Sequence, residues 1–422
     1  MVEVIAMRRK FWAAVFLGPG LLLSGWHTDS MAAMSHSAAS HSPIVLQGNL
    51  SSVSNASFLI DMYMVNARTG FVSGYWHNRF SVWKTADGGL CWDRQAVPYV
   101  PRYNPISGDV PPVFYDLNGT DWIAWIAKDH QVNRLTVLRS ADGGRRWTYH
   151  AQTVIPVANS VKQISFWSGE NGWIRAFSGG VMNQGDTSIY YTGNGGGSWA
   201  LVSSGAGYVP NTHATSQALP EFDVPMPMVF TSARDGWVAI GDVVQTQTSL
   251  AVLYHTTTAG KKWFPVRLSV PNPYRHGFAT MEYQPVFSQN TGTVLVQYLG
   301  NNLSFVVGYQ TTDGGKTWAA GTPVSFGKQD NTVVQSFINP RIGWVIGNSG
   351  SAFERTQNGG RSWSAIRITG FLATLLRNGY SIKRLDMVTP KMGWMMVENE
   401  NGMTSGVITR ILRTTDGGRI WR

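Results

Sequence analysis

The amino-acid sequence predicts an all-β fold: a seven-bladed β-propeller of four-stranded antiparallel blades, closed by an N-terminal latch strand. Three observations predict this class. An eight-residue phrase ending in Trp occurs seven times, with successive Trp residues 45 to 64 positions apart. A second motif, an aromatic residue or Met followed by Gly and usually Trp, lies upstream of each phrase. Short strand-like runs flank both motifs. A fixed period of this length is typical of solenoids, propellers and arrays.

The eight-residue phrase has the composition of a hairpin turn. In most copies a hydroxyl residue is followed by Asp or Asn, two glycines and, at the end, Trp. Glycine supplies positive φ, and the Asp or Asn side chain accepts backbone N–H groups across the turn. The Trp begins the outgoing strand and is expected to be buried. The residues predicted to define the turns are Asp87 and Trp92, Asp142 and Trp147, Asn194 and Trp199, Thr258 and Trp263, Asp313 and Trp318, Asn358 and Trp363, and Asp416 and Trp421.

The fourth copy of the phrase departs from the others. It has Thr258-Ala259-Gly260 where the others have Asp or Asn followed by two glycines. A Thr hydroxyl caps backbone N–H groups more weakly than a carboxylate does. This turn is therefore expected to be the least rigid of the seven.

The upstream motif completes a four-stranded unit. It places Gly and usually Trp about six residues after an aromatic residue or Met, as in Phe166 to Trp173 and Met387 to Trp394. One strand ends at the aromatic residue, a second carries Gly-Trp, a third enters the eight-residue turn and a fourth leaves it. Seven such sheets arranged radially make a propeller.

The repeated phrase resembles the Asp-box, or bacterial neuraminidase repeat, of sialidase-type propellers. Combined with Gly-Trp at this period, it is similar to photosystem II assembly-factor propellers and their non-photosynthetic bacterial relatives. The resemblance covers roughly residues 44–422. It implies a seven-bladed propeller in which the Asp-box is structural. It also implies, as one function, a role in assembling a membrane complex.

The segment 43–50, Pro-Ile-Val-Leu-Gln-Gly-Asn-Leu, precedes the first unit and belongs to no repeat. The last phrase ends at Trp421, which leaves the seventh unit without its own fourth strand. We expect this segment to complete the seventh blade, since closure removes the open sheet edges that invite aggregation. The alternative is that residues 43–50 are a linker.

Residues 1–42 are predicted to be a signal peptide or N-terminal anchor with a Ser/His/Ala-rich linker, and residues 43–422 the propeller. Arg8, Arg9 and Lys10 form a basic region ahead of an apolar stretch at 11–23, which is short for a transmembrane helix. Trp26 stands where a lipoprotein would need Cys, which excludes lipidation there. The propeller is expected to be secreted or extracytoplasmic. Cleavage and an uncleaved anchor both remain open.

The chain is basic, with a formal net charge of +10 and a pI near 9.7. Outside the cell such a charge favours acidic proteins, wall polymers and anionic lipid headgroups as partners. Nucleic acid is not expected, since no recognition motif is present. Charge that serves only solubility stays an alternative. Cys91 is the only cysteine, so no intramolecular disulfide is expected. The sequence indicates no metal, no cofactor and a monomer.

Four long inserts, at 97–112, 201–227, 267–285 and 367–384, each follow a fourth strand. In a propeller such connections rise on the face opposite the eight-residue turns, here called the loop face. Long loops on a rigid scaffold commonly carry binding sites. Arginine with aromatic residues is typical of a protein-binding or glycan-stacking surface. The candidate binding residues are Tyr99, Arg102, Tyr103, Tyr274, Arg275, Tyr283, Arg367, Arg377, Tyr380, Lys383 and Arg384.

No catalytic residues are assigned. In sialidases the first of the three arginines that grip the substrate carboxylate lies in an Arg-Ile-Pro motif ahead of the first Asp-box. Here Arg68 and Arg79 are the candidates, and neither has that context. Hydrolysis by paired carboxylates needs two facing acids, which the sequence does not identify. The first hypothesis is therefore a non-catalytic scaffold that binds a protein or anionic envelope component through the loop face. The alternative is a sialidase-like glycoside hydrolase with a non-standard site.

Overall fold

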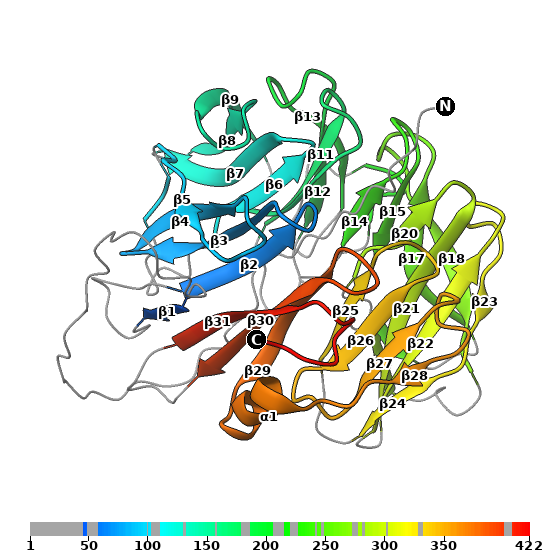
Figure 1. The fold of residues 1–422 in the computed structure, drawn as a ribbon. Helices are drawn as coiled ribbons and strands as arrows, with labels where there is room; N and C mark the ends of the chain where they lie inside the picture. The colour runs from blue at the N-terminus through cyan, green and yellow to red at the C-terminus, as the bar shows by residue number, and fades with distance from the viewer. Residues whose placement is uncertain are drawn as a thin grey trace, which may run out of the picture.

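Seven antiparallel sheets lie side by side around a ring in the computed structural model, which confirms the seven-bladed β-propeller (Figure 1). The structure describes residues 45–48, 58–98, 100–102, 110–129, 132–156, 158–178, 186–205, 215–219, 227–240, 243–245, 249–271, 277–280, 283–300, 303–327, 332–400 and 407–422. The predicted signal segment lies outside these residues. None of the helices among them has the length and apolar character needed to cross a membrane.

Each blade is named by its order in the chain. Blade 1 contains β2 (Phe58–Met64), β3 (Gly70–Trp76), β4 (Arg79–Thr85) and β5 (Asp93–Arg94). Blade 2 contains β6 (Val113–Leu117), β7 (Thr120–Asp129), β8 (Val132–Ser140) and β9 (Thr148–Val154). Blade 3 contains β10 (Ser160–Phe166), β11 (Gly172–Phe177), β12 (Thr187–Thr192) and β13 (Ala200–Ser204).

The next three blades follow the same strand order. Blade 4 contains β14 (Met228–Phe230), β15 (Gly236–Ala239), β17 (Ser249–Thr256) and β18 (Phe264–Ser269). Blade 5 is interrupted on both edges and contains β19 (Gly277–Thr280) with β20 (Val286–Ser288), β21 (Thr291–Gly300), β22 (Leu303–Thr311), and β23 (Ala319–Ala320) with β24 (Val324–Gly327). Strand β16 (Val243–Gln245) pairs with β19. Blade 6 contains β25 (Val333–Phe337), β26 (Gly343–Gly347), β27 (Phe353–Thr356) and β28 (Ser364–Ala365).

Blade 7 contains β29 (Ser381–Met387), β30 (Gly393–Glu400) and β31 (Val407–Thr414), and the short β1 (Val45–Gly48) is placed beside β31. The other half of the β31 edge pairs with the C-terminal residue, since Arg413 and Arg422 exchange two backbone hydrogen bonds of 2.8 and 3.0 Å. Residues 43, 44, 49 and 50 of the expected latch lie outside the described residues. The latch therefore stays a prediction.

The latch has a direct test. A chain that begins at residue 51 should be less stable than one that begins at residue 43, by about 1–4 kcal/mol for the few backbone hydrogen bonds lost. It should also scatter more light on heating, because an open edge invites pairing between chains. Chemical denaturation of the two chains measures the difference. Equal midpoints would show that residues 43–50 are a linker.

The eight-residue turns share one hydrogen-bond pattern. In the first, Thr85 Oγ1 accepts the Gly89 N–H at 2.8 Å, and Asp87 Oδ1 accepts the Cys91 N–H at 3.0 Å. In the second turn the equivalent N–H, that of Arg146, is the main reason that the pKa of Asp142 is lowered. The first glycine donates its N–H to the turn between the first two strands of its own blade, as Gly143 does to the Gly119 carbonyl at 2.9 Å. Both kinds of turn therefore lie on one face, here called the turn face.

The fourth turn keeps the pattern with different residues. Thr258 Oγ1 accepts the Lys262 N–H at 2.9 Å, in place of a carboxylate. Ala259 takes the position of the first glycine and has φ of +59°, a left-handed conformation that costs an L-residue roughly 1–2 kcal/mol. Its N–H still donates to the Arg234 carbonyl at 2.9 Å.

Ala259→Gly should therefore stabilise the protein, by up to about 1 kcal/mol after allowing for the flexibility of glycine in the unfolded chain. Ala320→Gly, in the exposed strand β23, is the matched control and should destabilise. Urea unfolding of both variants checks the signs. A loss of stability in Ala259→Gly would refute the strain at this position.

The spacing of the upstream motif has a steric cause. In six blades a Phe or Met at or next to the end of the inner strand lies opposite the first glycine of the second strand, as Phe166 lies opposite Gly172. A Cβ on that glycine would collide with the Phe166 ring, and the same holds for Phe230 over Gly236. The glycine is kept because the ring occupies the space of its side chain.

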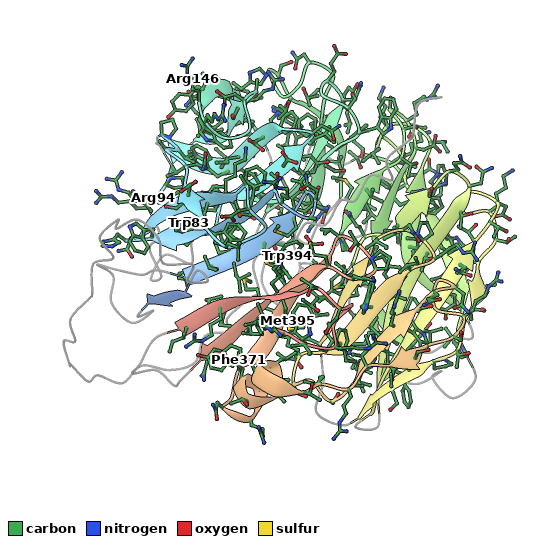
Figure 2. The ribbon with its side chains drawn as sticks, viewed as in Figure 1. Trp83, Arg94, Arg146, Phe371, Trp394 and Met395 are labelled. Carbon is green, nitrogen blue, oxygen red and sulfur yellow. The ribbon has the colours of Figure 1, made fainter. Side chains whose placement is uncertain are left out.

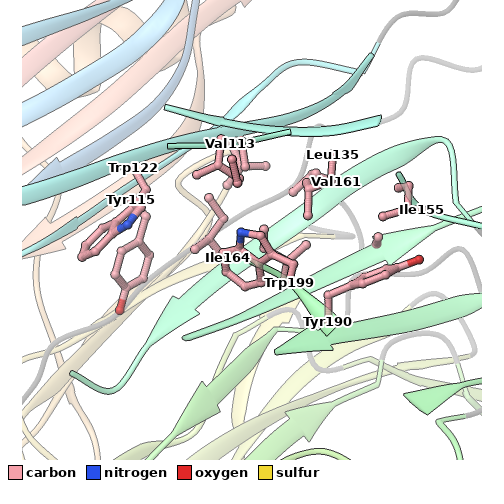
Figure 3. Close-up of a cluster of buried hydrophobic side chains, with 14 of the residues drawn as sticks. Val113, Tyr115, Trp122, Leu135, Ile155, Val161, Ile164, Tyr190 and Trp199 are labelled. Atoms are coloured by element: carbon pink, nitrogen blue, oxygen red, sulfur yellow. The ribbon is translucent and has the colours of Figure 1, made fainter. Parts of the chain in front are cut away.

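These rings form the contact between blades. Trp122 of blade 2 stacks on Phe166 of blade 3 with ring centroids 4.0 Å apart, and Trp173 stacks on Phe230 at 3.5 Å. The Trp122 indole N–H donates to the Gly195 carbonyl, in the turn of blade 3, at 2.8 Å. Figure 3 shows the cluster around Trp122, Tyr115 and Trp199 that results. The second-strand Trp thus bridges neighbouring blades.

A basic side chain covers the same ring on four blades. Each comes from the third strand, directly opposite the aromatic residue, and lies 5.1 to 5.8 Å from the ring centroid: Lys84 over Phe71, Arg139 over Trp122, Arg355 over Trp344 and Arg413 over Trp394. Lys84 also reaches the next blade, where its Nζ donates to the Gly143 carbonyl at 2.7 Å. Cation–π contact therefore adds to the joint between blades.

Blade 2 departs from the ring-over-glycine rule. There Asp116 lies opposite Asp121, at the position that Phe166 and Gly172 occupy in blade 3. Both carboxylates are buried, with Asp121 fully covered. Burial, followed by the neighbouring Asp116, raises the pKa of Asp121 to about 9, and burial also raises the pKa of Asp116. This pair is a local cost in an otherwise apolar joint.

Blades 7 and 1 are joined by the same kinds of contact as the other neighbouring blades, and this closes the ring. The Trp394 indole N–H donates to the Gly88 carbonyl at 2.9 Å, and Asp386 accepts the Met64 N–H at 2.6 Å. Arg384 of blade 7 pairs with Asp61 of blade 1 at 2.7 Å. These contacts close the ring independently of β1.

One insert contains a helix, which the sequence analysis did not anticipate. Helix α1 (Gly370–Arg377) lies in the connection between blades 6 and 7, within the insert at 367–384. Its Leu372 and Leu375 are buried in the cluster that joins those two blades. The spacing of three residues between these leucines places them on one helix face.

Candidate functional site

The structure describes seven of the eleven candidate binding residues. Tyr99, Tyr103, Tyr274 and Arg275 lie outside the described residues. Each of the four inserts does connect a fourth strand to the next first strand, which places them at the loop face. The insert at 267–285 also contributes strand β19. The described candidates fall into three settings.

In the first setting the charges face partners within the ring. Lys383 and Arg384 lie in β29, where Lys383 pairs with Glu398 at 3.8 Å and Arg384 pairs with Asp61 at 2.7 Å. Tyr380 is buried, and its hydroxyl accepts a hydrogen bond from Arg410 Nε at 3.1 Å. These three residues join strands and blades and are poorly placed to meet a ligand.

In the second setting the side chains lie at the edges of the inserts. Arg367 and Arg377 are exposed on either side of α1, and Arg377 Nε donates to the Ala373 carbonyl at 3.3 Å. The exposed ring of Phe371 belongs to the same helix (Figure 2). Tyr283 is half-buried and lines a small pocket between blades 5 and 6, beside Gln297 and Gln335. The pocket has room for about one water molecule.

In the third setting Arg102 lies opposite a second arginine. An isolated antiparallel bridge places Arg102 opposite Arg79, the first residue of β4. Both residues are exposed. Side chains that face each other across such a bridge have Cβ atoms roughly 5 Å apart, and like charges there repel. The bridge thus places two arginine side chains at facing positions at the loop end of blade 1.

The turn beside these arginines adds aromatic surface. Trp76, the last residue of β3, lies opposite Arg79, and its ring centroid is 4.8 Å from that of His77. His77 and Asn78 have φ of +48° and +63°, which is the backbone of a two-residue type I′ hairpin. Trp76 is half-buried against the blade 1 core and His77 is exposed. We call Trp76, His77, Arg79 and Arg102 the Trp76–Arg102 cluster.

Sequence reasoning found only part of this cluster. Arg102 was a candidate binding residue, whereas Arg79 was considered only as a sialidase arginine and Trp76 and His77 were not singled out. A local signal was present, since Asn between two alternating strands favours a tight hairpin. The bridge between Arg79 and Arg102 joins residues across the insert and has no local signal.

The cluster can bind anions, and none of its four residues is a carboxylate. Paired guanidinium groups bind carboxylates through charge-assisted, bidentate hydrogen bonds. Across the residues that the structure covers, no group of three or more His, Cys, Asp or Glu could hold a metal ion. The described carboxylates that face each other directly, Asp116 and Asp121, are buried near the turn face.

The fold and the cluster define this protein as a seven-bladed β-propeller with an arginine and aromatic cluster on its loop face. Among solved structures, "YCF48 bound to D1 peptide" is 13% identical, with a TM-score of 0.49, 90% of this chain and 98% of that chain covered. YCF48 from Cyanidioschyzon merolae is 15% identical, with a TM-score of 0.48, 87% of this chain and 98% of that chain covered.

A glycoside hydrolase has a similar architecture. The GH93 alpha-L-arabinofuranosidase of Fusarium graminearum with arabinobiose is 16% identical, with a TM-score of 0.42, 71% of this chain and 91% of that chain covered. No protein-family model matches the chain, and no curated protein matches it. At these identities the likeness concerns the fold alone.

Proposed function

We propose that this protein is a non-catalytic, extracytoplasmic scaffold that binds an acidic segment of a protein partner on its loop face. The observation that carries the proposal is the bridge that holds Arg79 opposite Arg102 in solvent. Two exposed like charges repel each other in the free protein, and a carboxylate-bearing ligand relieves that repulsion.

The rest of the cluster favours a protein over a free anion. Tryptophan and arginine are the residues most often found at the energetic centre of protein interfaces. Trp76 is half-buried, so its ring is already held by the blade 1 core and loses little freedom on binding. The type I′ hairpin likewise fixes the backbone at His77. The cluster is therefore prepared for contact before the partner arrives.

The proposal also specifies where the protein lies and what kind of complex it binds. The basic and apolar pattern of residues 8–23 supports export across the cytoplasmic membrane. The resemblance of the repeats to photosystem II assembly-factor propellers supports a role in assembling a membrane complex. A rigid ring with one binding face suits a scaffold, because function on a propeller is set by the site placed on it.

The hydrolase alternative gains no specific support from the described residues. Most glycoside hydrolases use two accessible carboxyl groups that face each other across a substrate, although sialidases use a Tyr nucleophile. Asp116 and Asp121 face each other, yet both are buried. The carboxylates of the inserts at 201–227 and 267–285, which are Glu221, Asp223 and Glu282, lie outside the described residues.

Replacing Arg79 and Arg102 together by Ala tests the proposal. The full chain with a C-terminal tag is incubated with solubilised envelope from its source cells and eluted with a salt gradient. We expect the parent to retain a discrete protein beyond about 0.3 M salt, where the Debye length is well below 10 Å. The double variant should bind that protein at least tenfold more weakly and release it at lower salt, because hydrogen-bonded charge pairs are lost.

The matched control is Arg145→Ala with Arg361→Ala, which removes the same charge from the turn face and should leave retention unchanged. Equal retention by the Arg79 and Arg102 variant would remove the cluster from the binding site. Release of only lipid or polymer by the parent, at low salt, would remove the scaffold role. Thermal melts of each variant show that the blades remain folded.

A further inference from the structure

The turn face carries a circle of cations that the proposed function does not use. The residue after the second glycine of each eight-residue turn is basic in five blades and exposed in all five: Arg145, Lys261, Lys316, Arg361 and Arg419. The two preceding positive-φ residues, such as Gly143 and Gly144, turn the chain over just before this position. Equivalent positions in a propeller are spaced around the ring, so these charges surround the face.

A second set of cations lies on the same face. The turns between first and second strands carry Arg68, Arg234, Arg341 and Lys391, each of them exposed. These turns contact the eight-residue turns directly, as Gly417 contacts Lys391 through a backbone hydrogen bond of 2.7 Å. Arg146 projects from blade 2 into solvent beside Arg145 (Figure 2).

The acids of the turn face do not cancel this charge. With Arg146 and Lys262 included, the turns of this face carry eleven exposed cations and six carboxylates that are not buried. The carboxylates of Asp87, Asp142, Asp313 and Asp416 each accept backbone N–H groups within their own turns. The cations sit one to three residues further along, at the exposed tips. Cations therefore occur on the turn face of every blade except blade 3, whose turns carry the exposed Glu170 and no cation.

Two apolar side chains interrupt the circle at one place. Leu90 and Ile420, in the eight-residue turns of blades 1 and 7, are 41% and 46% exposed. Leu90 takes the position that Arg419 takes in blade 7. The two turns are neighbours across the ring closure, where Trp394, behind the blade 7 turn, bonds to Gly88.

We propose that the turn face docks on an anionic lipid bilayer. A flat surface of negative headgroups meets cations from six of the seven blades at once, whereas a single compact ligand would meet only a few. Exposed Lys and Arg near such a surface add to the attraction individually. Leu90 and Ile420 then enter the boundary between headgroups and acyl chains, where apolar side chains gain from burial. The loop face, with the Trp76–Arg102 cluster, is left pointing away from the membrane.

Vesicle co-sedimentation tests this docking. The full chain is mixed with vesicles of phosphatidylcholine alone or with an equal share of phosphatidylglycerol. The test variant carries Lys261→Gln, Lys316→Gln and Arg361→Gln, and the control carries Arg79→Gln, Arg102→Gln and Arg377→Gln on the loop face. Both lose three charges. Any insertion of residues 11–23 is common to all samples and to both kinds of vesicle.

We expect phosphatidylglycerol to increase parent binding strongly, and the turn-face variant to lose about 100-fold in partition coefficient, from roughly fivefold per cation. The loop-face control should lose no more than a few-fold. Leu90→Ser with Ile420→Ser should weaken the binding that survives 0.3 M salt.

Three results would overturn the proposal. Equal losses in the two triple variants would mean that net charge, with no defined face, attracts the protein. Equal binding to both kinds of vesicle would mean that headgroup charge has no role. Tight, turn-face-dependent binding to a soluble polyanion such as polyphosphate, without binding to phosphatidylglycerol, would assign the face to a polymer. Each outcome is separate from the Arg79 and Arg102 test, which measures the other face.

Discussion

Trp394→Ala is expected to lower the free energy of unfolding by about 3–5 kcal/mol, the range for removal of a buried Trp. Trp394 is 1% exposed and lies in the joint between blades 7 and 1. Its loss opens a cavity there, removes the surface beneath Arg413, and leaves the Gly88 carbonyl without the indole N–H. Urea unfolding followed by far-UV circular dichroism measures the change.

Two further variants separate the causes of this loss. Trp394→Phe keeps most of the packing and should cost about 1–2 kcal/mol, mainly for the hydrogen bond. Trp318→Ala removes a half-buried ring that packs on Trp237 and Phe287 within blades 4 and 5. It should cost less than Trp394→Ala. If the two alanine variants lost the same stability, the closure joint would be no more important than an internal one.

Replacing Asp116 by Phe and Asp121 by Gly should stabilise the protein by about 1–3 kcal/mol at pH 8, the range for the cost of a buried polar group without full hydrogen bonding. The change gives blade 2 the Phe-over-glycine pair of blades 3 to 6. Stability at pH 8, compared with the parent, is the measurement. A loss would mean that the nearby Phe71 and Phe114 rings leave no room for a third.

The same pair sets a pH dependence with a defined sign. The pKa of Asp121 is about 9 in the folded protein, far above its ordinary value of 3.8. Between these values the folded state holds a proton that the unfolded state has released, so stability falls as pH rises. Lys84 opposes the shift and Asp142 adds to it. Asp121→Asn should make the stability less dependent on pH. An unchanged dependence between pH 5 and 9 would mean that other groups cause it.

The sequence predicted the blades because their motifs are local. The Gly-Trp motif and the eight-residue turn each mark a strand end within a few residues, and the register places Phe166 opposite Gly172 as that spacing requires. The exception at Asp116 and Asp121 was also visible, since Asp121 stands where other units have Gly. The burial of the two carboxylates was not predicted, because it depends on packing against the neighbouring blade.

The candidate site was predicted less well for the same reason. Lys383 and Arg384 were expected on the loop face, but both lie in β29, which begins at Ser381. There Lys383 pairs with Glu398 within blade 7, and Arg384 pairs with Asp61 of blade 1. Helix α1 had a local signal, since Phe371, Leu372, Leu375 and Leu376 have helical spacing. The bridge between Arg79 and Arg102 depends on how the insert at 97–112 folds back, which no pattern within it indicates.

The claim that the loop face binds a protein has one direct test. The chain's only cysteine, Cys91, is exposed in the turn of blade 1, on the opposite face. A second protein carries His77→Cys in a Cys91→Ser background. Each is labelled with a benzophenone maleimide, mixed with source-cell envelope and irradiated. We predict a discrete protein adduct from position 77, rich in acidic residues at the cross-link and lost when Arg79 and Arg102 are replaced by Ala. Protein adducts from Cys91 with none from position 77 would contradict the proposed function.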